Sequence, residues 1–150
     1  NTLDKAIRLQ KVELFADMET DALALAASIA SQIDCPSGAV LFKENGSADA
    51  LFVVLSGRVQ LTRGAREIGS FGPGEALGNW ALFDDQPSPA TATCVEESWL
   101  LKIEREEFFD LLADHADMTQ KMLKALVKRV RGLRERVLGA DQAPKGVPHA

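Results

Sequence analysis

The chain of 150 residues contains little of the chemistry from which most catalytic and metal sites are built. It has two histidines, His115 and His149, and two cysteines, Cys35 and Cys94, with no CxxC or Cys/His spacing. A metal-binding β-roll would need several histidines on its strands, so that class is excluded. Nucleophile-elbow, Walker and dinucleotide-binding motifs are also missing. We therefore expect a protein that is not an enzyme and holds no metal.

Two isolated cysteines in a chain long enough to bury a core are expected to be small buried hydrophobic residues rather than a disulfide. That interpretation favours a reducing compartment, and we expect a cytoplasmic protein. Residues 22–32 form an uncharged alanine-rich run that is too short to cross a bilayer, and we expect no signal peptide before it. Because the first residue is Asn1 rather than Met, we expect a piece of a longer chain that carries an effector domain.

Positive charge is missing from the middle of the sequence, where no Lys or Arg lies between Arg66 and Lys102. Residues 1–116 carry 9 Lys and Arg against 19 Asp and Glu, whereas residues 117–138 carry 7 against 2. A basic helix on an acidic body can bind nucleic acid or anionic lipid. It can also lie against its own acidic domain or that of a partner, which is the interpretation we favour.

The order of the elements indicates a mainly β protein with flanking helices. Apolar residues recur at helical spacing in the first thirty residues, starting with Leu3 and Ile7. Glycine-bounded strand-like runs then follow, which favour an antiparallel roll or sandwich. These runs are residues 39–42, 51–55, 59–62, 67–71, 91–95 and 99–103. Helix returns at Glu104, where acidic residues fill the first turn.

The last predicted helix covers residues 116–138 and is expected to stop at Gly139. Its apolar positions are spaced alternately by three and four residues, as in a heptad seam. They are Leu123, Leu126, Val130, Leu133 and Val137. We expect one domain over residues 1–138, a disordered tail over 139–150, and a possible homodimer or docking surface through residues 123–137.

Helices, a glycine-punctuated roll and a two-helix lid in this order resemble the cyclic nucleotide-binding domain family. The resemblance covers about residues 3–135 and rests on several motifs taken together. They are LF at 14–15, PSGAVLFKENGSADALFVVLSGRVQL at 36–61, FGPGEALGNWALFDD at 71–85, AT at 90–91 and LLKIEREEFFDLL at 100–112. It implies an antiparallel β-roll, or jelly roll (double-stranded β-helix), with N-terminal helices and a C-terminal two-helix lid.

The family binds cAMP or cGMP in a phosphate-binding cassette. Its pattern is Gly-Glu-aliphatic-Ala/Gly-Leu, about four residues, then Pro-Arg-x-Ala-Ser/Thr. The matching positions here imply a ligand site at Gly78, Asn79, Trp80, Ala81, Leu82, Ser88, Pro89, Ala90 and Thr91. Asn79 stands where the family's glutamate would take the ribose hydroxyl, and Ser88 where its arginine would pair with the phosphate. Glu75 lies too early in the sequence to replace the glutamate.

Without the arginine and the glutamate, about 4 kcal/mol of binding free energy is lost, which is roughly a thousandfold in affinity. Asp84 and Asp85 further disfavour a phosphate. We therefore expect cAMP to bind weakly or not at all. A pocket retuned to a less anionic small molecule and residual cyclic nucleotide binding are the alternatives.

The resemblance also implies a regulatory role, in which ligand capture moves a hinge near residues 104–112 and shifts the final helix. Many bacterial members of the family end in a helix-turn-helix. Only about a dozen residues follow the final helix here, so we expect no DNA-binding module within this sequence.

Overall fold

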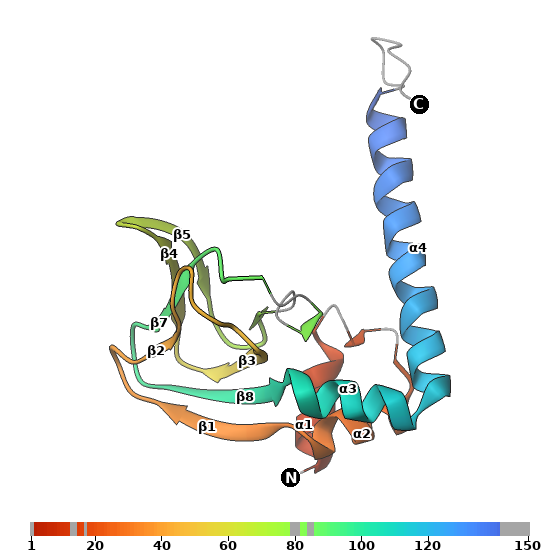
Figure 1. The fold of residues 1–150 in the computed structure, drawn as a ribbon, viewed down its shortest axis with the longest axis horizontal. Coiled ribbons are helices and arrows are strands. Elements are labelled where there is room, and N and C mark those ends of the chain that lie inside the picture. Colours follow the sequence, from red (N-terminus) through yellow and green to blue (C-terminus); the bar gives the residue numbers. More distant parts are fainter. Residues whose placement is uncertain (1, 13–14, 17, 79–81, 84–85, 142–150) are drawn as a thin grey trace.

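A computed structural model describes residues 2–12, 15–16, 18–78, 82–83 and 86–141 of the chain. In sequence order, two helices precede the strands and two helices follow them. The helices are α1 (Thr2–Gln10), α2 (Thr20–Ser28), α3 (Arg105–Asp114) and α4 (Ala116–Asp141). The strands are β1 (Ser31–Cys35), β2 (Val40–Phe42), β3 (Ala50–Ser56), β4 (Val59–Arg63), β5 (Arg66–Phe71), β6 (Ala76–Leu77), β7 (Thr91–Cys94) and β8 (Ser98–Glu104). Figure 1 shows the strands gathered in one lobe with the helices beside it.

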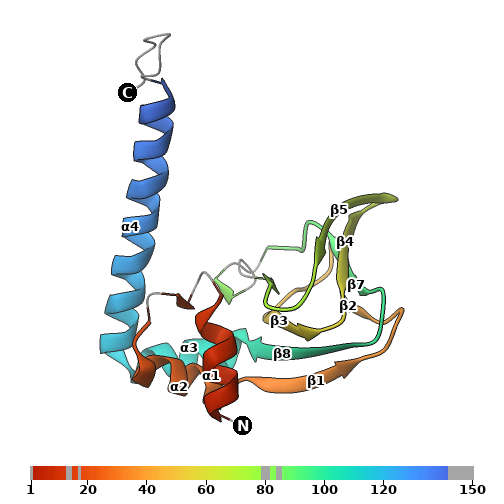
Figure 2. The same ribbon diagram turned by 180° about the vertical axis from the view of Figure 1, so that it is seen from behind.

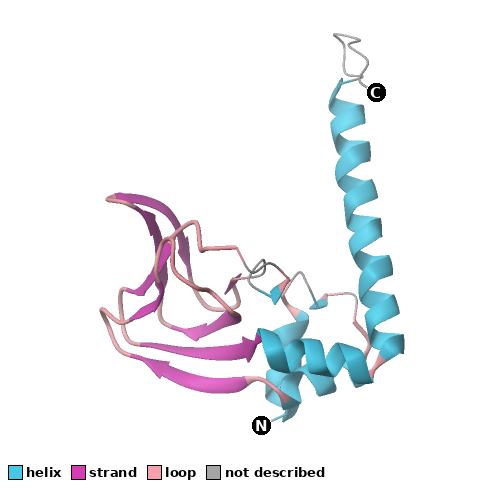
Figure 3. Cartoon of the chain, in the orientation of Figure 1, coloured by secondary structure: helices cyan, strands magenta, loops and turns pink. Residues whose placement is uncertain are grey.

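The strands form two four-stranded antiparallel sheets, ordered β1-β8-β3-β6 and β2-β7-β4-β5. Figure 2 shows the same arrangement from behind, and Figure 3 separates the strand lobe from the helices by colour. The predicted mainly β architecture with flanking helices is confirmed. Strands β1 and β6 are additional to the predicted ones.

Strands β3 and β8 form the wall between two hydrophobic cores. Their side chains alternate, because successive residues of a strand point to opposite faces. On one face, Leu51 and Val53 pack with the helices in a cluster that includes Phe108. On the other face, Phe52 and Val54 pack inside the roll. This double burial explains why β3 is a continuous apolar run rather than an alternating one.

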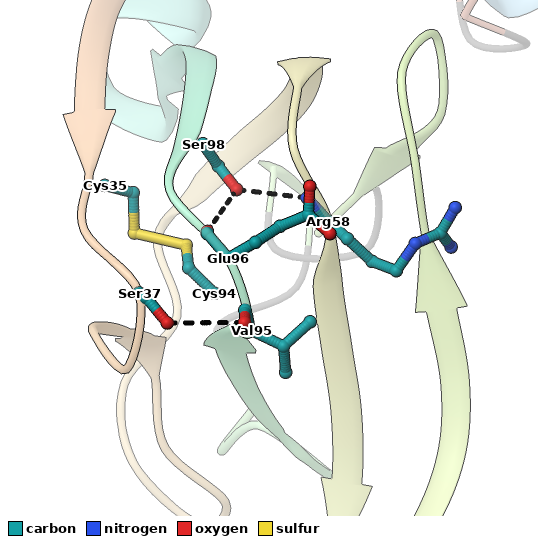
Figure 4. The surroundings of a disulfide bond; sticks show 7 residues. All are labelled: Cys35, Ser37, Arg58, Cys94, Val95, Glu96 and Ser98. Atoms are coloured by element: carbon teal, nitrogen blue, oxygen red, sulfur yellow. Dashed lines mark hydrogen bonds between the residues drawn. A yellow bond between two sulfur atoms is a disulfide. The ribbon is translucent and has the colours of Figure 1, made fainter.

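The two cysteines are joined by a disulfide bond, so the prediction of two separate thiols is wrong. Cys35 ends β1 and Cys94 ends β7, with their Cα atoms 6.5 Å apart (Figure 4). Both residues are buried, as predicted. The spacing of 59 residues gives no sign that the two strand ends meet. Because the thiols are paired, they no longer support a reducing compartment.

Helix α4 extends away from the strand lobe in both views (Figures 1 and 2). Met118 and Met122 in its first turns are buried against the other helices. The Nζ atom of Lys121 lies 2.7 Å from Oε1 of Glu19, the N-cap residue of α2. The helix continues to Asp141, past the stop expected at Gly139. The predicted tail beyond it lies outside the described residues.

Most of the predicted seam on α4 is exposed. Leu123, Val130, Leu133 and Val137 are all more than half exposed, and Val127 joins them. Leu126 is half-buried.

In α1, Leu3 and Ile7 of the predicted apolar stripe are also exposed, and Leu9 is the residue of this stripe that is buried in the core. The described part of the chain holds no helix that combines the length and the apolar character needed to span a membrane.

Candidate functional site

The predicted cassette begins at Gly78, directly after β6. Gly78 has φ +86°, a conformation that side chains rarely adopt. A Cβ atom at this position would lie 2.5 Å from the carbonyl oxygen of Ala50. The chain therefore passes so close to β3 that only glycine fits, which explains the residue type at this position.

The structure describes six of the nine predicted site residues. Gly78, Ser88, Pro89 and Ala90 all line one cavity, whereas Leu82 and Thr91 do not. Leu82 is fully buried in the core beneath the helices, and the Thr91 hydroxyl accepts a hydrogen bond of 2.8 Å from the Glu44 backbone nitrogen. Asn79, Trp80 and Ala81 lie outside the described residues, as do Asp84 and Asp85.

The cavity has a volume of about 390 Å³, within the range of about 300–1,000 Å³ that is typical of small-molecule sites. Its described lining is Phe42, Ala48, Leu61, Leu77, Gly78, Gln86, Pro87, Ser88, Pro89 and Ala90. None of these residues is charged. Leu77, Ser88 and Ala90 are buried and form the floor, whereas Gln86, Pro87 and Pro89 are exposed at the mouth.

Ser88, which the sequence predicts to stand at the family's arginine position, is buried and hydrogen-bonded within its own loop. Its hydroxyl donates to the Ala90 carbonyl at 2.7 Å and accepts from the Ala90 nitrogen at 3.3 Å. Its backbone nitrogen donates to Gly46 and its carbonyl accepts from Asn45, at 2.9 and 2.7 Å. The hydroxyl thus stabilises the loop, and its one proton is already donated within the protein.

Glu75 does not replace the missing glutamate. Its carboxylate accepts a hydrogen bond of 2.8 Å from the backbone nitrogen of Gly72, which closes the turn between β5 and β6. Within the described residues, no group of His, Cys, Asp or Glu has an arrangement able to hold a metal ion.

Arg63 reaches the cassette from β4 and was not predicted to do so. Its Nε donates a hydrogen bond of 3.0 Å to the carbonyl oxygen of Pro89, 26 residues away in sequence. The signal was available in the strand pattern, because Val59, Leu61 and Arg63 alternate along β4 and therefore share a face. Val59 is buried in the roll, Leu61 lines the cavity, and Arg63 follows at the exposed end.

Aromatic contacts connect the cassette to the helices. Phe83, next to the buried Leu82, meets the ring of Phe108 edge-on with centroids 5.8 Å apart, and its centroid lies 6.4 Å from that of Phe109. Phe108 also contacts Phe15, at 6.2 Å. Because Phe108 and Phe109 belong to α3, the cassette is in direct contact with the helix that precedes α4.

The sequence profile of the cyclic nucleotide-binding domain matches residues 32–115. A CRP-like cAMP-activated global transcriptional regulator of Mycobacterium tuberculosis is 26% identical over 128 residues, which are 82% of this chain and 57% of that protein. A lysophospholipase nte1 of Neurospora crassa is 31% identical over 100 residues, which are 63% of this chain and 7% of that protein. The chain thus spans little more than half of one of these relatives and a small part of the other.

The solved N-terminal domain of a transcriptional regulator from Streptomyces coelicolor A3(2) has a TM-score of 0.76 at 29% identity, covering 87% of this chain and 95% of that chain. The matched residues run from the second residue of β1 to the end of α3 and so include the strands of the roll. The chain belongs to the cyclic nucleotide-binding domain family.

Proposed function

We propose that this chain is a non-catalytic regulatory domain whose cassette has lost high affinity for cAMP. The observation that carries the proposal is the state of Ser88, which occupies the arginine position, is buried, and uses its hydroxyl on Ala90. The described lining of the cavity adds no charged side chain. A cyclic phosphate would therefore leave water without a cationic partner from the cassette.

The expected loss of binding free energy indicates how weakly cAMP would bind. An arginine fork on a phosphate contributes two charge-assisted hydrogen bonds, each worth roughly 1.5–3 kcal/mol. With Asn79 in place of the glutamate as well, the expected loss of about 4 kcal/mol weakens binding roughly a thousandfold. A cavity retuned to another small molecule is the second candidate, because the apolar cavity itself persists.

The output of the domain would run through the aromatic contacts to α3 and then to α4. Leu82 and Phe83 link the cassette to Phe108, and α4 starts two residues after α3 ends. In this proposal the exposed seam of α4 docks on a second copy of the chain, giving a homodimer, and an attached effector responds to its position. The proposal includes a cytoplasmic location, which is supported by the family's regulatory role alone.

Thermal unfolding with cAMP at millimolar concentration tests the proposal. A ligand at about 100 times its dissociation constant adds about 2.7 kcal/mol of stability. For a domain of this size that is a shift of roughly 5–10 °C in Tm, and we expect less than about 2 °C for the natural sequence. A large shift with the natural sequence contradicts the proposal.

An Asn79→Glu, Ser88→Arg double variant provides the complementary measurement, with Ser88→Ala as the control. We expect the double variant to gain a cAMP-dependent shift in Tm, because it restores both polar partners of the nucleotide. The control keeps the cavity but adds no charge, so its Tm should respond to cAMP no more than that of the natural sequence does.

A further inference from the structure

The cavity combines an apolar wall with polar groups that are already engaged. Phe42, Leu61 and Leu77 supply large apolar side chains to its described lining. The Ser88 hydroxyl is hydrogen-bonded to Ala90 on both its donor and its acceptor side. A ligand body that carries many hydroxyl groups would leave them unpaired against such a wall, whereas an apolar body would gain from leaving water.

Arg63 is bonded to the rim of this cavity, although it is not part of the described lining. Its Nε is fixed on the carbonyl of Pro89, which is both an exposed residue and part of the lining. A guanidinium presents its N–H donors as a planar fork, so a bond through Nε leaves the terminal nitrogens directed past that carbonyl. No described residue accepts a hydrogen bond from these terminal nitrogens.

The described carboxylates at this end of the roll are hydrogen-bonded to groups other than Arg63. Arg66 pairs with Arg63 across the tip of the β4–β5 hairpin. The nearby Glu44 carboxylate accepts a hydrogen bond of 2.8 Å from the backbone nitrogen of Gly64, which holds it on the hairpin backbone. Glu67, which lies opposite Thr62 on the same hairpin, accepts a hydrogen bond from the Gln60 side-chain amide. Two arginines and two carboxylates thus share the described part of this end, and neither carboxylate is bonded to Arg63.

We propose that the cavity binds a small organic acid with an apolar body and a single anionic group, and that Arg63 of β4 holds the anion in place of the missing cassette arginine. The inference rests on the proposed loss of cAMP affinity, since it assigns a different ligand class to the same cavity. It places the charge at the mouth and the apolar body between Phe42, Leu61 and Ala90, the reverse of a polar nucleotide seated on the cassette.

A matched pair of fluorescent probes tests the inference on the full chain. Anilinonaphthalene sulfonate has an apolar aromatic body and one anionic group, and phenylnaphthylamine has the same body without the charge. We expect Arg63→Gln to weaken binding of the sulfonate about tenfold while the neutral probe changes by less than about twofold, because one charge-assisted contact at a partly exposed site is removed.

Two further variants make the result specific. Arg66→Gln removes the neighbouring charge that does not contact Pro89, and we expect it to leave both probes unchanged. Ala48→Trp fills the cavity from a loop, so we expect the signals of both probes to fall to the low background that the exposed apolar face of α4 contributes. Melting temperatures of all variants establish that they are folded.

Equal sulfonate binding by Arg63→Gln and the natural sequence would overturn the inference, as would an equal loss of both probes or full fluorescence in Ala48→Trp. None of these outcomes depends on cAMP. A strong cAMP shift in the natural sequence would instead overturn the proposed function, so the two failures are distinguishable.

Discussion

At the scale of single residues, the cassette is shaped by backbone constraints as much as by side-chain chemistry. Gly78 combines a positive φ with a close approach to Ala50, and the Ser88 hydroxyl donates its hydrogen bond to the Ala90 carbonyl. Both residues shape the walls of the cavity without offering it a charge. Among the described residues, the cation that contacts the cassette is Arg63, which belongs to β4.

Replacing Gly78 with alanine should therefore destabilise the domain by about 2–4 kcal/mol, because it adds a strained φ and a clash with the Ala50 carbonyl. Gly74→Ala is the matched control: its φ is +88°, close to the +86° of Gly78, but nothing lies within 4 Å of the added Cβ. The control should lose only about 1–2 kcal/mol. Urea unfolding measures both. Equal losses would mean that the approach to β3 imposes no constraint.

At the scale of elements, α4 differs from the other helices because most of its apolar side chains face solvent. Its first two turns are anchored by Met118 and Met122, and the seam beyond them is exposed. In the heptads that start at Leu123, arginines occupy three of the four flanking e and g positions up to Val137, namely Arg129, Arg134 and Arg136, and Val127 occupies the fourth. Two copies paired along the seam would therefore bring arginines together beside the apolar contact.

This arrangement predicts a dimer that strengthens as salt is added. Apolar burial drives the association, while like-charge pairs oppose it by a few tenths of a kcal/mol each until they are screened. We expect the dimer dissociation constant to fall about three- to fivefold between about 0.05 M and 0.5 M salt, measured by sedimentation equilibrium.

Leu133→Glu should abolish the dimer, because it places a charge in the seam. Gln120→Glu introduces the same side chain at an exposed position outside the seam and should leave the dimer intact. A Leu133→Glu protein whose mass and salt response match those of the natural chain would show that the seam is not the interface.

At the scale of the whole molecule, the roll is held at one end by the helices and at the other by the disulfide. The bond between Cys35 and Cys94 joins the ends of β1 and β7, one strand from each sheet (Figure 4), and Figure 1 shows β1 running away from the helices toward this end. Hydrogen bonds from Gly38 to Cys94 and from Cys94 to Ala39, of 2.6 and 2.9 Å, fasten the same corner. The helices thus belong to one hydrophobic core and the disulfide to the other.

Local patterns predicted most of this architecture, and long-range pairings account for what they missed. The strands bounded by glycine turns were predictable because turn and strand signals are local. Strand β1 was not, because SQIDC is polar and mostly exposed except at Cys35. The Cys35–Cys94 bond and the Arg63–Pro89 contact join residues 59 and 26 positions apart, and no short-range pattern encodes them.

Removing the disulfide should lower the free energy of unfolding by about 3–4 kcal/mol, because the closed loop of 59 residues restricts the unfolded chain. Urea unfolding with and without a reductant measures the loss. A Cys35→Ser, Cys94→Ser variant should already show it and should not respond to the reductant. Titration of two free thiols in the unfolded, never-reduced protein would contradict the pairing. Because the helical core is anchored separately, we expect the reduced protein to keep its α3 and α4 helices at low urea concentration.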